Sequence, residues 1–253
     1  MIKQSVIFRD LGGWDYQSAW DYQEQLLKEN VRKKSLVASN VTITEPVTDK
    51  FTDHALPPDS DTRHYLLFVE HPPVYTLGKS GNIDNLLLSE EGLADKEIAF
   101  YRTNRGGDIT FHGPQQIVGY PILDLEKFST DIGKYLRNLE EVIILTLKDY
   151  GIAGERSPGE TGVWIDAGIA GRERKICAIG VRCSRWITMH GFAFNVNTDL
   201  SYFDNIIPCG IGNKKVTSLE RELGKQVDLR QAKERVKANF EKVFDVLLIS
   251  DRG

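Results

Sequence analysis

The pattern of hydrophobic and polar positions predicts strands and helices that interleave along the chain. Helices are expected where apolar positions fall three or four apart, at residues 14–31, at 131–150 before Gly151, and from Asp228 to Leu247. Short runs rich in β-branched and aromatic residues predict strands at 2–8, 64–70, 74–77, 98–102, 117–125, 163–165, 175–182 and 186–196. Hairpin signals are as strong as crossover signals, so the pattern favours an α+β fold with a mixed sheet flanked by helices.

Turn and capping residues refine this arrangement. Cys183 and Ser184 are expected to join the last two strands as a hairpin, and the run from Thr217 to Glu220 fits a capping box on a short helix that stops at Gly224. Residues 33–63 contain three prolines and no clear period, which predicts an inserted loop, partly extended at 36–44, within a single domain spanning 1–253.

The composition narrows the class of protein. Hydrophobic residues make up 41% of the chain and the net charge is −4, values typical of a soluble globular protein and not of a disordered one. The chain has no apolar run long enough to cross a membrane and no apolar leader after Met1. The near-neutral charge argues against nucleic-acid binding through global charge. Three cysteines cannot form a disulfide framework, which favours the cytoplasm.

The densest chemistry lies between Arg105 and Pro114, where three glycines and a proline stand beside Arg, Asp, Thr and His. Paired glycines let a ligand approach the backbone closely, so a binding loop is expected. A tight turn between strands is the alternative, because such turns are also rich in glycine.

One cysteine and one lysine are the candidate reactive groups. Pro208 and Gly210 place Cys209 in a turn, whereas Cys177 lies in an apolar run and fits a packing role. Most free cysteines are inert small hydrophobes, and a reactive one needs a cation to lower its pKa. Lys175 heads an apolar strand and could point into a cleft. It belongs to a cationic stretch with only Glu173 opposing it, formed by Arg172, Arg174, Lys175, Arg182 and Arg185.

Several motifs are missing from the sequence. No phosphate loop of the G-x-x-x-x-G-K-[ST] type and no G-x-G-x-x-G occurs, so neither ATP nor a dinucleotide is required. Histidine and cysteine spacings match no metal-binding motif, and no G-x-S-x-G elbow indicates a serine hydrolase. We therefore expect no metal and no cofactor.

Together these segments resemble the octanoyl-[acyl-carrier-protein]:protein N-octanoyltransferase family of lipoate biosynthesis. The similarity lies in ordered blocks at 70–78, 105–114 with 119–125, 162–164, 175–182, 190–196 and 199–211. It implies a biotin/lipoate ligase-like fold and transfer of an octanoyl group from octanoyl-acyl carrier protein to a lysine of lipoyl domains, those of 2-oxoacid dehydrogenase complexes and of the glycine cleavage H protein. It also implies that Cys209 is the acyl-thioester nucleophile and that Lys175 lowers its pKa. The residues implied to line the acyl site are Arg105, Gly106, Gly107, Asp108, Ile109, Thr110, Phe111, His112, Ala178, Ile179, Gly180, Gly191, Phe192 and Ala193.

Some positions depart from the family pattern. Phe111 stands where tyrosine is common, and Phe192 and Phe194 replace smaller leucines, which leaves the shape of the acyl tunnel open. Two other functions stay open: an ATP-dependent lipoate–protein ligase, which would not need Cys209, and a non-catalytic module that binds carrier or lipoyl domains. The cationic stretch from Arg172 to Arg185 is a candidate docking site for an acidic carrier protein.

Overall fold

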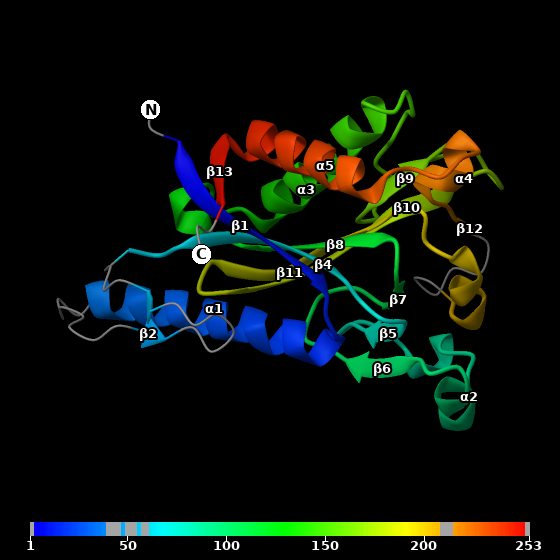
Figure 1. Ribbon diagram of the computed structural model, residues 1–253, viewed down its shortest axis with the longest axis horizontal. Helices are drawn as coiled ribbons and strands as arrows, with labels where there is room; N and C mark the ends of the chain where they lie inside the picture. The colour runs from blue at the N-terminus through cyan, green and yellow to red at the C-terminus, as the bar shows by residue number, and fades with distance from the viewer. Residues whose placement is uncertain (1–2, 39–46, 49–54, 57–60, 208–214, 251–253) are drawn as a thin grey trace.

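The computed structural model describes residues 3–38, 47–48, 55–56, 61–207 and 215–250. Within these ranges eight strands form a mixed sheet in the order β12–β10–β11–β8–β4–β1–β13, with β9 paired to β10 (Figure 1). The strands are β1 (Gln4–Gly13), β4 (His64–Glu70), β8 (Gln116–Ile122), β9 (Val163–Ile165), β10 (Arg174–Ser184), β11 (Ile187–Asn195), β12 (Lys215–Val216) and β13 (Val246–Ser250).

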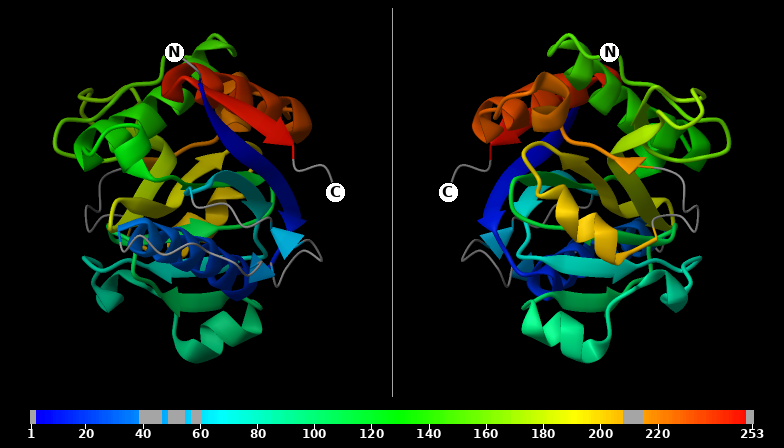
Figure 2. Two further views of the ribbon diagram at one scale, coloured as in Figure 1. Left: turned by 90° about the vertical axis from the view of Figure 1, so that its left-hand side faces the viewer. Right: turned by 90° about the vertical axis from the view of Figure 1, so that its right-hand side faces the viewer.

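Helices cover both faces of this central sheet. On one face lie α3 (Ile132–Lys148) and α5 (Leu229–Phe244), and on the other lies α1 (Tyr16–Ala38) (Figure 2). Every residue of β8 and β11 is buried, because a strand covered on both faces has no solvent side. One hydrophobic core lies between the sheet and α3 and α5, and a second lies between the sheet and α1.

A smaller sheet stands beside the first and carries its own core. It contains β5 (Val74–Leu77), β6 (Ala99–Arg102) and β7 (Ile109–His112), with α2 (Glu90–Asp95) packed nearby (Figure 1). The remaining elements are β2 (Val47–Thr48) paired with β3 (Ala55–Leu56), the short helix α4 (Leu219–Leu223), and three turns of 3-10 helix, η1 (Ile83–Asn85), η2 (Leu125–Lys127) and η3 (Leu200–Asn205). No helix in the described ranges is both long enough and apolar enough to pass through a membrane.

The predicted mixed sheet with flanking helices is confirmed, and so are several element ends. The strands at 64–70, 74–77 and 163–165 have their expected bounds. Asp228 caps α5, because its side chain accepts hydrogen bonds from the backbone N–H groups of Arg230 and Gln231. The hairpin between β10 and β11 is also present, but the expectation that Cys183 and Ser184 form its turn was wrong: both lie in β10, and the turn is formed by Arg185 and Trp186, both at positive φ.

Other helices begin or end at residues that differ from the expected ones. The first helix continues to Ala38, so residues 36–38 are helical instead of extended, and the rest of the expected extended stretch, 39–44, lies outside the described residues. The N-cap of α4 is Ser218 and not Thr217. The last helix ends at Phe244, because Asp245 takes a left-handed conformation (φ 52°), and residues 246–250 form β13 parallel to β1. This edge strand exists because β1 offers it an open partner, which local periodicity does not reveal.

Candidate functional site

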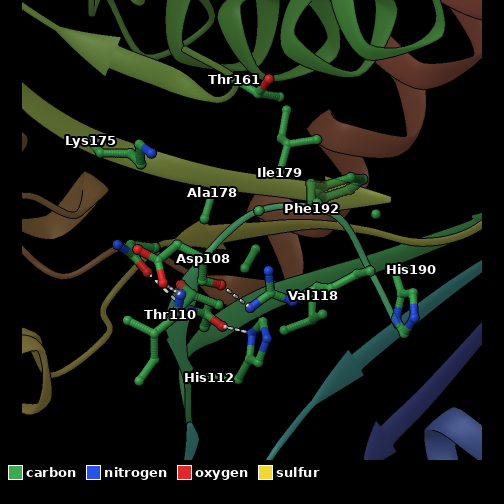
Figure 3. Close-up of a pocket in the computed structure, with 18 of the residues that line it drawn as sticks. Asp108, Thr110, His112, Val118, Thr161, Lys175, Ala178, Ile179, His190 and Phe192 are labelled. Atoms are coloured by element: carbon green, nitrogen blue, oxygen red, sulfur yellow. Dashed lines mark hydrogen bonds between the residues drawn. The ribbon is translucent and has the colours of Figure 1, made fainter. Parts of the chain in front are cut away.

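A cavity of about 440 Å³ lies among β7, β8, β10 and β11. Most of the residues predicted to bind the substrate line it. They are Arg105, Gly107, Asp108, Ile109, Thr110, His112, Ala178, Ile179, Gly180, Gly191, Phe192 and Ala193, and Lys175 lines it too. In Figure 3, Lys175 and His190 lie at opposite ends, with Ala178, Ile179, Phe192 and Val118 between them. Strands far apart in sequence thus bring the predicted residues into one site.

Two predicted binding residues do not line the cavity. Gly106 faces strand β10, where its N–H donates to the Val181 carbonyl (2.9 Å). The ring of Phe111 stacks on Tyr202 with centroids 4.5 Å apart, inside the core of the small sheet. Phe111 therefore packs the small sheet against η3 and does not line the cavity, so its expected contact with the acyl group stays a prediction without support from this cavity.

The segment from Arg105 to Pro114, here called the glycine loop, is held in shape by the buried Arg105 side chain. Its guanidinium donates to the Thr76 carbonyl (2.7 Å), to Thr76 Oγ1 (2.9 Å) and to the Asp108 carbonyl (2.9 Å). A further hydrogen bond runs to the Gly106 carbonyl (3.0 Å). These bonds direct the guanidinium toward the loop itself, so Arg105 supports the cavity wall.

Close backbone approach is needed at a glycine outside this loop. A Cβ at Gly180 would lie 2.7 Å from the Gly106 carbonyl oxygen and 3.2 Å from the Arg105 side chain. By contrast, Gly106 has room for a Cβ, and Gly107 is required for its left-handed φ of 88°. The facing strand β10 can approach the loop only because Gly180 carries no side chain.

Sequence reasoning missed several lining residues. Three of them, Tyr16, Val118 and His190, come from α1, β8 and β11. Others come from the segment before β9, namely Gly159, Glu160 and Thr161. His190 stands at the start of the segment 190–196 that carries the family resemblance, but Tyr16 lies in a helix whose periodicity indicates only packing. No local signal places it at this cavity.

Three histidines at or beside the cavity are buried and neutral. Burial lowers the pKa of His71 to about 4 and that of His190 to about 3. The pKa of His112 lies well below its usual value, first because of burial and then because of the nearby His71 and Arg105. His112 Nδ1 donates to the Gln116 side-chain oxygen (3.0 Å), an arrangement that a neutral ring can satisfy. This end of the cavity is polar without carrying histidine charge.

Lys175 occupies the other end, between β9 and β12. Its Nζ lies 4.5 Å from the centroid of the Trp164 ring, a cation–π contact. Gly162 borders the same side chain, and a Cβ there would come within 3.5 Å of the lysine Cε and 2.6 Å of the Cys177 carbonyl. The lysine is thus held at the cavity by packing, as its position at the head of β10 predicted.

The candidate nucleophile Cys209 lies outside the described residues, so its pairing with Lys175 stays a prediction. The two described cysteines are poor candidates. Cys177 is fully buried and Cys183 is half-buried, and burial raises the pKa of both thiols. A raised pKa leaves little thiolate at neutral pH, as expected of packing residues.

Known proteins resemble this chain along almost its whole length. A family model, the lipoyl protein ligase A/B catalytic domain, matches residues 15–241. The chain belongs to this family. It is 55% identical over 248 residues to the octanoyltransferase of Christiangramia forsetii, covering 98% of this chain and 99% of that protein. It is also 55% identical over 249 residues to the octanoyltransferase of Flavobacterium psychrophilum, covering 98% and 100%. The chain is therefore an acyltransferase enzyme.

Solved structures show the same fold at low sequence identity. One is the bi-partite lipoate protein ligase of Thermoplasma acidophilum, with a TM-score of 0.64, 14% identity and coverage of 99% of this chain and 87% of that one. Another is a lipoate-protein ligase A bound with ATP, with a TM-score of 0.63, 11% identity and coverage of 99% and 89%. The expected lipoate ligase-like fold is confirmed.

The cationic stretch does not present a uniform positive face in this member of the lipoyl ligase A/B family. Arg174 forms ion pairs with Asp166 (2.6 Å) and Glu222 (2.6 Å). Arg172 also contacts Asp166, and Arg182 pairs with Glu24. These carboxylates offset much of the positive charge of the stretch. A carrier docking site along 172–185 stays a prediction, and its net positive charge is smaller than the sequence indicated.

The described part of the site contains polar groups but no cluster of metal ligands. Among the described residues, no cluster of three or more histidine, cysteine, aspartate or glutamate side chains could hold a metal ion. The polar contacts at the cavity involve the Arg105 guanidinium, the Asp108 carboxylate, neutral histidines, amides and backbone groups. The chemistry available from the described residues is that of Lys175 and of oriented hydrogen-bond donors.

The buried histidines of this family member should make its stability fall in mild acid. Four of them have a lowered pKa, namely His64, His71, His112 and His190. The unfolded chain binds protons near pH 6.5 whereas the folded chain does not, so the free energy of unfolding should drop as pH falls below about 6.5. Each histidine should contribute up to about 1.4 kcal/mol per pH unit between about pH 6.5 and pH 5.

Urea denaturation at several pH values between about 6.5 and 5 measures how the free energy of unfolding changes with pH. His64 lies away from the cavity, so the variant His64→Gln serves as the comparison. The free energy of unfolding of this variant should change with pH less steeply, by up to about 1.4 kcal/mol per pH unit. A free energy of unfolding that stays constant over the whole range would contradict the prediction.

Proposed function

We propose that the enzyme transfers an octanoyl group from octanoyl-acyl carrier protein to a lysine amine of lipoyl domains, through a thioester on Cys209. The acceptors would be the lipoyl domains of 2-oxoacid dehydrogenase complexes and the glycine cleavage H protein. The observation that carries the proposal is a cavity with an apolar middle and Lys175 at one end. It occurs in a chain whose full-length relatives are named octanoyltransferases.

The middle of the cavity suits an aliphatic chain. Val118, Ile179, Phe192 and Ala193 contribute apolar surface there. Burying the methylene groups of an octanoyl chain is worth about 0.8 kcal/mol each, or roughly 5 kcal/mol for six, before binding costs. That gain favours a medium-length acyl group over a short one.

The first half-reaction moves the acyl group to the enzyme. Lys175 accepts the proton of the Cys209 thiol, and the resulting ammonium stabilises the thiolate. The thiolate attacks the carbonyl carbon of the donor thioester and forms a new carbon–sulfur bond. The tetrahedral intermediate then releases the carrier thiolate, which takes the proton back from the Lys175 ammonium.

The second half-reaction moves the acyl group to the acceptor. The neutral amine of a lipoyl-domain lysine attacks the enzyme thioester, and the Cys209 thiolate leaves as the amide bond forms. The proton lost by the amine passes to Lys175, which restores the ion pair. Because a thioester is already an activated acyl group, neither half-reaction needs a nucleotide, and ping-pong kinetics follow.

An assay without ATP tests this function. The enzyme is incubated with octanoyl-carrier protein and an isolated lipoyl domain, and the mass of the lipoyl domain is measured. We expect octanoylation of the domain without ATP, together with a transient octanoyl adduct on the enzyme. Modification that occurs only with free octanoate and ATP would instead identify a ligase, and binding without modification would identify a non-catalytic module.

Phe192 should set the preferred acyl length. Its ring lines the cavity and lies against Gly119, where a Cβ would meet it at 2.1 Å. Phe192→Leu should leave space for a longer chain and raise the kcat/KM ratio of decanoyl to octanoyl donor about fourfold for each methylene newly buried. Competition between the two donors measures that ratio.

Phe194 provides the matched control. It lies on the same strand, in the core between the central sheet and helices α3 and α5, and it does not line the cavity. Phe194→Leu should lower stability and leave the decanoyl-to-octanoyl ratio unchanged. Equal shifts in the ratio for both variants would contradict a specific role of Phe192.

A further inference from the structure

The chain segment that leads to residue 208 is attached to η1 and the two residues that follow it. Ile206 pairs with Leu86 in an isolated β-bridge, and the Leu87 N–H donates to the Asn205 carbonyl (2.9 Å). The Ile207 N–H then donates to the Asn85 carbonyl (2.8 Å). Ile207 stands two residues before Cys209, so the backbone at Asn85 sets where the chain enters the segment that contains the proposed nucleophile.

Asn85 is itself held by a residue of the cavity wall. Its side-chain nitrogen donates to Asp108 Oδ2 at 2.7 Å, and Asp108 Oδ1 accepts from the Ile109 N–H, also at 2.7 Å. The main chain of Asp108 is fixed in turn, because its carbonyl accepts from Arg105 (2.9 Å) and from the Gly78 N–H (3.2 Å). The carboxylate is therefore a rigid anchor that faces both the cavity and η1.

We propose that Asp108 is a positioning residue, which acts through Asn85 to fix the backbone at Ile207 and thereby the approach of Cys209 to the acyl carbonyl. This inference rests on the proposed function, because it concerns the alignment of that nucleophile. The continuous path of hydrogen bonds from the glycine loop through Asp108 and Asn85 to Ile207 supports it. Figure 3 shows Asp108 among the residues of the cavity.

Other contacts hold η3 but do not replace this path. Phe111 stacks on Tyr202, and the Tyr75 hydroxyl donates to the Tyr202 carbonyl (2.6 Å). Both contacts hold the chain at Tyr202, seven residues before Cys209, and the Asn205 side chain donates to the Tyr75 hydroxyl (3.1 Å) four residues before it. The Asp108–Asn85 pair acts closer to it, so its loss should disturb alignment more than folding. A displacement of about 1 Å at a reacting group can lower a rate about 100-fold.

A reciprocal exchange tests the proposal. In Asn85→Asp two carboxylates face each other and the hydrogen bond is lost. In the double variant Asn85→Asp with Asp108→Asn the donor and acceptor are exchanged, and the bond can form again in the opposite direction. Asn82→Ala is the matched control, because Asn82 caps the same turn through Asp84 and has no described hydrogen bond to Asp108.

The measured quantities are the rate of acyl-enzyme formation from octanoyl-carrier protein, by rapid quench and intact mass, and the donor KM. Asn85→Asp should slow acylation about tenfold or more with little change in KM. The double variant should recover to within a few-fold of the wild-type rate, and Asn82→Ala should acylate normally. Melting temperatures should not follow this order.

Two results would overturn the inference. The first is a wild-type acylation rate in Asn85→Asp, and the second is a double variant as slow as the single one. Failure of the proposed function would look different, because the wild-type enzyme itself would then form no adduct on Cys209. Wild-type acylation therefore serves as the reference that separates the two.

Discussion

Replacing Cys209 with alanine is expected to abolish the octanoyl-enzyme adduct and to lower transfer by on the order of 10⁴-fold or more, as the loss of a covalent nucleophile does in other enzymes. The physical reason is that the acyl group has no second carrier: without the thiolate, the acceptor amine must attack the donor thioester directly. Intact mass after incubation with octanoyl-carrier protein measures the adduct. Transfer to a lipoyl domain measures the rate.

The two described cysteines provide the control. Cys183→Ala should keep both the adduct and the rate, because the Cys183 thiol is half-buried and burial raises its pKa. Cys177 is less suitable as a control, since its side chain is part of the main core and its removal would leave a void. An octanoyl adduct that persists on Cys209→Ala would reject the assignment and direct attention to these other thiols.

Replacing Lys175 with methionine should slow both half-reactions, by about 10²- to 10⁴-fold in kcat, the usual contribution of a positioned acid–base group. Methionine is an unbranched side chain one atom shorter than lysine, and it removes the ammonium that lies over the Trp164 ring. Without the ammonium, the pKa of Cys209 should rise toward the value of an ordinary thiol, about 8.5. The pH dependence of Cys209 alkylation by iodoacetamide measures that rise directly.

An arginine at this position separates charge from proton transfer. Lys175→Arg retains a cation that can stabilise a thiolate, but a guanidinium stays protonated and cannot accept the proton of the amine. The pH dependence of Cys209 alkylation in Lys175→Arg should therefore stay close to that of the wild type. Transfer to the lipoyl domain should be slow, as in Lys175→Met. Lys215→Met, an exposed cation on the adjacent strand β12, is the control and should change neither. Alkylation profiles that coincide for wild type and Lys175→Met would contradict the pairing.

Local sequence chemistry predicted much of this molecule. The buried strand 64–70 and the amphipathic helix after Asp131 appear with the expected bounds or cap because short-range patterning and capping decide them. The same holds for the glycine loop, whose predicted members Asp108, Thr110 and His112 line the cavity. Most residues of this loop line the cavity as expected, because their surroundings are largely set by their neighbours along the chain, whereas Gly106 and Phe111 do not.

Long-range packing decided the rest. Strand β13 forms only because β1 leaves an open edge, and the ring of Phe111 enters the small-sheet core because Tyr202 lies against it. The arginines of the cationic stretch are offset by Asp166, Glu222 and Glu24, which come from other parts of the chain. The path from Asp108 through Asn85 to Ile207 likewise joins three separate segments.

The sequence by itself determined the type of fold and the glycine loop, because both depend on residue type and local spacing. It also singled out Cys209 and Lys175 as candidate reactive groups, and their pairing is what the family resemblance implies. Only the tertiary structure decided which loop residues face the cavity, which cations are neutralised, and how the chain before Cys209 is anchored. Those properties depend on contacts between residues far apart in sequence, and such contacts form only when burial of the shared core offsets the entropy lost in bringing the segments together.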